Sequence, residues 1–237
     1  MRHTWLLLLT FVAALLFWAV WYLPASVVAG YAVPRLNEQG IAIELDRVQG
    51  TSWNGSADWR WQNWQGNVSW RLAWQGIKPA LDLTLNSGEA TLSGLVSGGS
   101  RSFDVRDGRF SAPLPMFLAG QSELSVAGVV SGRITQVQWA DGQVKALDGR
   151  LFYEGGAGRW QQQSAQLPAL FARLYLQQDM AIADILDEAD TALAKVTLDK
   201  GGMGRVEVYR TFAKAVGQSQ GSGRDDDVIF KIGQKLF

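Results

Sequence analysis

Apolar and polar residues alternate strictly through two parts of the segment from Val48 to Gly76, which holds six of the eleven tryptophans of the chain. Large apolar side chains occupy every second position from Ala57 to Trp61, and they do so again from Val68 to Trp74. A period of two residues predicts half-buried β-strands, whereas a helix would spread the same side chains around its cylinder. A polar connection through Asn63 and Gln65-Gly66 is predicted to join these strands into an antiparallel hairpin that forms one wall of a larger sheet.

The same alternation recurs along most of the chain, with turn residues about every 8–12 positions. Asp107-Gly108 and Asp141-Gly142 are predicted to be hairpin turns, because Asp-Gly is a strong turn signal. Residues 113–120 contain two prolines and are predicted to be a connection with one helical turn. Residues 180–195 fit both periods, and strands are favoured because a hairpin pattern follows. The predicted fold class is mainly β, with an antiparallel, hairpin-rich sheet that is open or groove-like.

An apolar segment without any charged residue, Trp5 to Leu23, precedes the alternating part. Its nineteen residues would rise about 28 Å as a helix, close to the hydrocarbon thickness of a bilayer. A transmembrane anchor is therefore predicted, and Arg2 favours an N-terminus in the cytoplasm. The alternative is a cleaved signal peptide with a cleavage site at residues 27–29, but the apolar segment is longer than the usual core of a signal peptide.

Three parts of the chain are predicted from these patterns. Residues 1–23 are a cytoplasmic tip and the transmembrane anchor, and residues 24–47 are a connector with a short helix and the first strand. Residues 48–237 form the β-rich domain. The short helix is expected between Ala25 and Gln39, bent or restarted near Pro34.

The composition excludes several kinds of chemistry. The chain has no cysteine, and its only histidine is His3, so disulfides, thiolate sites and histidine-based catalysis have no candidate residues in the β-rich part. The 22 basic and 22 acidic residues cancel, which argues against nucleic acid as a partner. The acidic residues within 184–190 and 225–227 are interpreted as solvated turns. No catalytic, cofactor-binding or metal-ligating residue is predicted, and the protein is expected not to be an enzyme.

The tryptophans are the candidate contact or structural residues. They are Trp53, Trp59, Trp61, Trp70 and Trp74. Burial in the core is the favoured role, since indole rings bury more apolar surface than other side chains. The alternatives are a stacking platform for sugars or bases, and an apolar sheet face left open for a lipid chain or for the edge strand of a partner.

Several features in order resemble the type II secretion system protein N family, the inner-membrane accessory proteins of the general secretory pathway. They are the end of the apolar segment at Leu23-Pro24-Ala25, the stretch G-T-S-W-N-G at residues 50–55, and the strands containing Trp61 and Leu72-Ala73-Trp74. The G-T-x-W-x-G pattern is the most specific of these.

This resemblance implies a single-pass protein of the Gram-negative inner membrane with a β-rich domain in the periplasm. Its implied role is accessory to the export of folded proteins, through contacts with other secretion-apparatus proteins and with the bilayer. No catalytic residue and no cofactor is carried over. The family also resembles the β-rich envelope proteins of the AsmA type, which implies an alternative function as a groove that binds lipid or another amphiphile.

Overall fold

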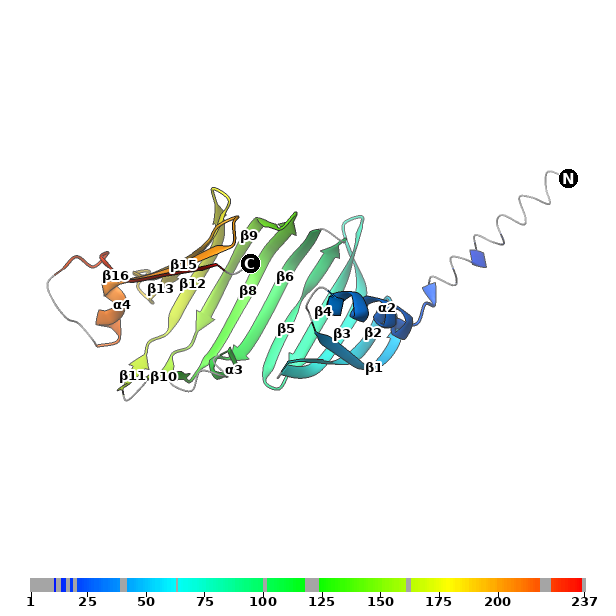
Figure 1. Ribbon diagram of the computed structural model, residues 1–237, viewed down its shortest axis with the longest axis horizontal. Helices are drawn as coiled ribbons and strands as arrows, with labels where there is room; N and C mark the ends of the chain where they lie inside the picture. Colours follow the sequence, from blue (N-terminus) through cyan, green and yellow to red (C-terminus); the bar gives the residue numbers. More distant parts are fainter. Residues whose placement is uncertain are drawn as a thin grey trace. The chain divides into compact units, whose positions relative to one another are not determined.

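The computed structural model describes most of the chain after the N-terminal segment. The described residues are 11, 14–15, 18, 21–38, 42–62, 64–99, 102–117, 124–160, 163–217 and 223–235. They divide into two compact units, one ending at Gly88 and one beginning at Glu89. Each unit is antiparallel and built almost entirely of strands (Figure 1).

The first unit packs one helix against four strands of the large sheet. Its elements are α2 (Ala25–Glu38), β1 (Ile43–Thr51), β2 (Asn54–Trp61), β3 (Trp64–Gln75) and β4 (Lys78–Ser87). The strands pair in chain order, each antiparallel to the next. The helix continues through Pro34 and contacts β1. The predicted short helix, first strand and tryptophan-rich hairpin are therefore confirmed.

The register of the first unit brings its tryptophans onto one face of the sheet. Trp61 lies opposite Trp64, and Gly55 lies opposite Trp70. Since alternate residues of a strand share a face, the five tryptophans of β2 and β3 share one. That face also carries apolar residues of β1 and β4 that are paired with these positions. They are Ile43, Leu45, Leu81, Leu83 and Leu85.

The second unit contains nine strands of the 13-stranded antiparallel sheet and a small three-stranded sheet. The nine strands, in order of pairing, are β5 (Ala90–Gly98), β6 (Ser102–Pro113), β8 (Val129–Ala140), β9 (Gln143–Tyr153), β12 (Leu170–Gln177), β13 (Met180–Leu186), β14 (Ala192–Leu198), β15 (Met203–Tyr209) and β16 (Val228–Lys235). The small sheet has the order β11 (Gln163–Leu167), β10 (Gly156–Trp160) and β7 (Leu124–Val126). The short helices are α3 (Leu114–Phe117) and α4 (Arg210–Ala215), and α4 contacts β14 and β15.

Few large side chains are fully buried in the described part of either unit. Among the described residues, Leu193 is the only large side chain that is fully buried, and most apolar side chains on the sheets are half-buried. In the second unit β16 is hydrogen-bonded to β15, and no described strand pairs with its other edge. The prediction of a mainly β, antiparallel and open sheet is confirmed.

One predicted turn was wrong. Asp107-Gly108 lies inside β6 and forms a bulge, because Gly94 of β5 faces both residues between the pairs Ser93–Arg109 and Leu95–Arg106. Asp107 has φ of 50°, so the left-handed conformation that favours Asp-Gly in a hairpin here accommodates an extra residue within a strand. The other prediction of this kind, Asp141-Gly142, is confirmed as the turn between β8 and β9.

The connection within the tryptophan-rich hairpin is shorter than residues 63–66. β2 ends at Trp61 and β3 begins at Trp64, so Gln65 and Gly66 belong to β3. Gln62 has φ of 53°, which lets the chain reverse directly after Trp61. The strands favoured over residues 180–195 are confirmed as β13 and the beginning of β14.

No helix among the described residues combines the length and the apolar composition that a bilayer crossing requires. The predicted anchor, Trp5 to Leu23, lies for the most part outside the described residues.

Candidate functional site

The stretch G-T-S-W-N-G forms the tight end of the β1–β2 hairpin. Gly50 pairs with Gly55 and Thr51 pairs with Asn54, which leaves Ser52 and Trp53 at the tip. Gly50 has φ of 87°, and a Cβ on it would lie 2.3 Å from the Asn54 carbonyl oxygen. A Cβ on Gly55 would lie 2.4 Å from the Gln49 carbonyl oxygen. Both glycines are therefore required by the close approach of the two strands.

This hairpin tip is tied to two other parts of the first unit. The Ser52 N–H donates to the Leu23 carbonyl oxygen at 2.9 Å, and Pro24 forms a bridge with Thr51. On the other side, the Trp70 Nε1–H donates to the Thr51 carbonyl oxygen at 3.1 Å. The motif thus joins the residues before α2 to β3, and its specific residues have a structural role.

The five candidate tryptophans have different environments. Trp53 is half-buried at the hairpin tip, and Trp59 and Trp70 are half-buried on the sheet. Trp61 and Trp74 are 41% and 66% exposed, respectively. The prediction of core burial therefore fails for Trp61 and Trp74, which lie near opposite ends of the paired strands, beside the β2–β3 and β3–β4 turns. The structure brings Trp59, Trp61, Trp70 and Trp74 onto one face and leaves Trp53 at the turn.

Trp59 is the only one of the five whose ring nitrogen is buried without a hydrogen-bond partner among the described residues. It lies opposite Gly66, and a Cβ on Gly66 would come within 1.8 Å of the Asn86 carbonyl oxygen. The missing side chain at Gly66 thus lets β3 and β4 approach closely beside the Trp59 ring.

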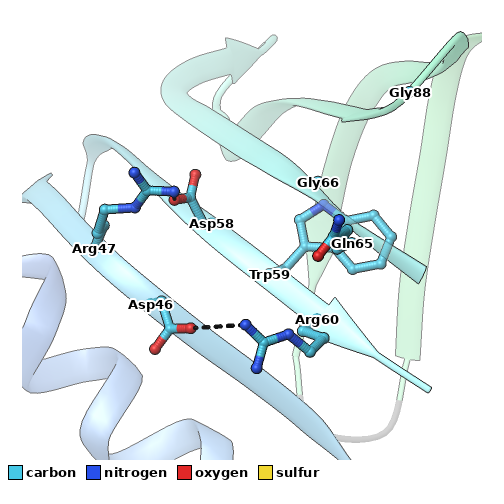
Figure 2. A pocket seen from close by; sticks show the side chains of 8 residues that line it. All are labelled: Asp46, Arg47, Asp58, Trp59, Arg60, Gln65, Gly66 and Gly88. Carbon is cyan, nitrogen blue, oxygen red and sulfur yellow. Dashed lines mark ion pairs between the residues drawn. The ribbon is translucent and has the colours of Figure 1, made fainter. Parts of the chain in front are cut away.

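A charged hollow of about 470 Å³ lies next to Trp59. Its lining residues are Asp46, Arg47, Asp58, Trp59, Arg60, Gln65, Gly66 and Gly88. Figure 2 shows the Trp59 ring beside Gln65 and Gly66, with the charged side chains along β1 and β2. The hollow is confined to the first unit.

A bulge in β1 places the charges of this hollow. The register shifts between Asp46 and Gln49, and Arg47 has φ of 47°. Arg47 forms an ion pair with Asp58, whose carboxylate also accepts a hydrogen bond of 3.3 Å from the Asn67 amide.

The second arginine of the hollow, Arg60, bridges two carboxylates of β1. It lies 2.9 Å from Glu44 and 3.8 Å from Asp46, and the Asp46 contact is drawn in Figure 2. Asp46 and Asp58 are directly opposite each other in the sheet, so both carboxylates of this like-charged pair are compensated by an arginine. This is the arrangement of a structural ion-pair network. Among the described residues, no group of three His, Cys, Asp or Glu side chains could hold a metal ion.

A comparison with models of protein families shows which family this chain belongs to. The model of the type II secretion system protein N family matches residues 42–221, about three quarters of the sequence. The chain belongs to this family. The matched region begins just before β1, so it includes the G-T-S-W-N-G tip, the tryptophan-rich face and the charged hollow.

Family membership gives the chain an accessory role in type II secretion, a form of protein transport. The searches of curated proteins and of solved structures both returned no match.

Neither acidic cluster of this family member frames a cleft. Asp184 lies 3.8 Å from Lys195 and accepts a 2.7 Å hydrogen bond from the Tyr175 hydroxyl, which raises the pKa of that tyrosine. The run at residues 225–227 forms ion pairs with three basic side chains around α4. They are Arg210, Lys214 and Arg224. The interpretation of both clusters as solvated turns and faces agrees with these contacts.

The turn between β13 and β14 gives one of these acids a pH dependence. Asp187 accepts hydrogen bonds of 2.8 Å each from the backbone N–H groups of Thr191 and Ala189, and these bonds, that of Thr191 first, lower the pKa of Asp187. The stabilisation is therefore present above the unfolded-state pKa of about 3.9 and is lost as the pH falls through the lower folded-state pKa. The difference in melting temperature between the natural chain and Asp187→Ala should shrink below about pH 4. A difference that stays constant in acid would contradict this assignment.

Proposed function

We propose that this chain is a non-enzymatic accessory component of type II secretion, held in the inner membrane of a Gram-negative cell. The N-terminal segment is the anchor, its tip lies in the cytoplasm, and the β-rich units lie in the periplasm. There they contact other proteins of the secretion apparatus during the export of folded proteins. Family membership supports the secretion role and suggests partners within the apparatus.

The observation that carries this proposal is the exposed apolar side chains at the two ends of the tryptophan-rich face. Trp74 is 66% exposed at the end beside the β3–β4 turn, where Ile77 is 93% exposed, and Trp61 is 41% exposed at the opposite end, where it pairs with Trp64. Exposed aromatic side chains are costly in water and are enriched in the centres of protein interfaces. Trp59 and Trp70, between these ends, are half-buried, whereas Trp61 and Trp74 are available for a partner.

The chemistry of the side chains supports a role without catalysis. The chain has no cysteine, and its single histidine is His3. In the described residues, the carboxylates of the hollow are bound by arginines, and Asp184 is bound by a lysine and a tyrosine. An acid and a base held apart across a cleft, which hydrolysis requires, have no candidate pair there.

A secretion assay tests the contact role. Cells that carry Trp61→Ser together with Trp74→Ser should release about tenfold less folded exoprotein, because both exposed aromatic contacts of the face are removed. Leu92→Ser is the control, since Leu92 is 49% exposed but lies in the second unit. Normal secretion by the double variant, with an unchanged melting temperature, would refute the proposal.

A second candidate function, amphiphile binding, is favoured by the second unit. One face of its large sheet is apolar on seven neighbouring strands, β8 to β16. Representative residues, from paired positions, are Ile134, Leu151, Leu174, Ala183, Val196, Val206 and Ile232. With so little fully buried, such a face could hold an acyl chain. Mass spectrometry of lipid extracted from the purified protein discriminates: a lipid-free preparation would rule this candidate out.

A further inference from the structure

Four arginines form a row across the second unit, on the opposite face from its apolar residues. Arg109 of β6 lies opposite Arg133 of β8, Arg133 lies opposite Arg150 of β9, and Arg150 lies opposite Arg173 of β12. We call these four residues the arginine row. Because neighbouring strands lie about 4.8 Å apart, the row extends over about 14 Å.

The arginine row is exposed and uncompensated. All four side chains are exposed, and within the described part of the chain none of them forms an ion pair. Like charges directly opposite each other destabilise a sheet. The row therefore costs stability, and no ion pair among the described residues offsets that cost.

The continuation of the same row shows how the chain compensates charge elsewhere. Beyond Arg173 the paired positions alternate in sign. They are Asp184, Lys195, Glu207 and Lys231. Lys195 forms an ion pair with Asp184, and Lys231 forms one with Glu207. The carboxylate directly opposite Arg173 is thus already bound by Lys195 and the Tyr175 hydroxyl.

The other acids near the row leave it largely uncompensated as well. Asp104 is bound by Arg106 at 2.9 Å. Asp148 lies two residues before Arg150 and opposite Gln136 and Tyr175, and it forms no ion pair among the described residues. Asp107, in the bulge two residues before Arg109, is exposed and also forms no ion pair among the described residues, so two unpaired carboxylates lie near four arginines.

An exposed aromatic pair adjoins the row on the same face. Phe152 and Phe171 lie opposite each other, two residues from Arg150 and Arg173, with ring centroids 5.0 Å apart. They are 37% and 40% exposed. Arginine beside an aromatic ring is the composition that dominates binding energy at protein interfaces.

We propose that the arginine row is a docking surface for a partner protein that presents a line of carboxylates on one helix. All four basic residues are arginine, whose planar guanidinium binds carboxylates through two parallel hydrogen bonds. The proposal rests on the proposed contact role and adds the chemistry of one partner.

The spacing favours a helix over a strand. Acidic residues three and four positions apart on a helix advance about 5–6 Å each, close to the distance between neighbouring strands. On an extended partner strand, residues on the same face repeat about every 6.8 Å and fall out of step over four arginines. Apolar residues of the same helix would cover Phe152 and Phe171.

The narrowness of the row favours a protein over a membrane surface. The positive charge is one residue wide and is bounded by Asp148 on one side and by the compensated Asp184–Lys195 pair at its end. A surface that lies on anionic lipid gains about 1 kcal/mol for each basic residue near the bilayer, and carboxylates on that surface oppose this gain.

Binding of a designed peptide to the full-length protein in mild detergent tests the proposal. The probe is a labelled helical peptide with glutamates at i, i+4, i+7 and i+11, and fluorescence anisotropy reports its dissociation constant. Replacing Arg133 and Arg150 together with threonine should weaken binding by about tenfold, since two exposed charge pairs are lost. Arg205→Thr is the matched control, because Arg205 is exposed on the same face but outside the row.

A control peptide and the melting temperature of the double variant distinguish the possible results. A peptide with glutamines in place of the glutamates should bind about a hundredfold more weakly, because all four charge pairs are lost. The double threonine variant should melt at the same temperature as the natural chain or higher, because a like-charge contact is removed. Equal binding by the natural chain and the double variant, or absent binding by the natural chain, would overturn the proposal.

The last measurement is binding of the protein to vesicles of phosphatidylethanolamine and phosphatidylglycerol. Vesicle binding that is lost in the double variant, without peptide binding, would assign the row to lipid and overturn the proposal. Because the peptide assay does not depend on secretion, the row can fail while the proposed function survives, and the reverse also holds.

Discussion

Replacing Trp70 with alanine is expected to lower the free energy of unfolding by about 3–5 kcal/mol, the usual cost of deleting a packed aromatic side chain. Its ring lies against Gly55, where a Cβ would come within 2.6 Å of Trp70 Cζ2. Its Nε1–H donates to the Thr51 carbonyl oxygen at 3.1 Å. Loss of the ring therefore leaves a cavity over the hairpin tip and an unpaired carbonyl.

Trp74→Ala is the matched control for this prediction. Trp74 lies on the same strand and the same face, but it is 66% exposed. Its replacement should change the free energy of unfolding by about 0.5 kcal/mol or less. Denaturant unfolding of both variants measures the difference. Equal costs for the two tryptophans would show that the hairpin tip is not held by Trp70.

Replacing Gly128 with alanine should destabilise the second unit by about 3 kcal/mol, through backbone strain and a steric clash together. Gly128 has φ of 107°, and a Cβ there would lie 2.3 Å from the Gly155 carbonyl oxygen and 2.7 Å from Tyr153 Cε2. Tyr153 is buried, and its hydroxyl donates to the Ala127 carbonyl oxygen at 2.7 Å. The neighbouring atoms therefore have little freedom to move away.

Gly142→Ala separates the two contributions. Gly142 also has a positive φ, 76°, but no atom lies within 4 Å of a Cβ at that position. Its replacement should cost only the backbone strain, about 1 kcal/mol. Thermal melting of both variants gives the comparison. If Gly128→Ala melts at the same temperature as Gly142→Ala, the close packing at Ala127–Gly128 is not as tight as the geometry indicates.

The strands were the most predictable part of this fold, because each one carries its own period-two signal. Large side chains at every second position from Trp59 to Trp61, and again from Val68 to Trp74, leave one register that places them on the same face. Of the two predicted Asp-Gly turns, Asp141-Gly142 was confirmed and Asp107-Gly108 was wrong. The local preference of Asp107 for a positive φ is real, but whether it reverses the chain or absorbs a bulge depends on the partner strand.

The tryptophan-rich face and the arginine row could not be predicted from the sequence, because each depends on the register between paired strands. The sequence separates Trp61 and Trp64 by only two residues, yet only the paired strands show that the tryptophans of both share a face. The arginine row depends on three successive pairings, and a bulge between Ile134 and Gln136 shifts the β8–β9 pairing beside Arg133. A change of one residue at any of these pairings would move an arginine to the apolar face.

The charged hollow was missed for a related reason. Arg47 reaches Asp58 because a bulge in β1 gives it a positive φ, and arginine carries no sequence signal for that conformation. In contrast, the family resemblance depended on the glycines and tryptophan of the hairpin tip. Their spacing is fixed by local geometry, so it is visible in the sequence.

Purification of the full-length protein in a gentle detergent, followed by mass spectrometry of both the proteins and the lipids that remain bound, tests the contact role most directly. We expect subunits of the secretion apparatus to be recovered with the natural chain. Fewer of these subunits should be recovered with the variant that carries Trp61→Ser together with Trp74→Ser. Recovery of bound lipid with no secretion-apparatus subunit would contradict it.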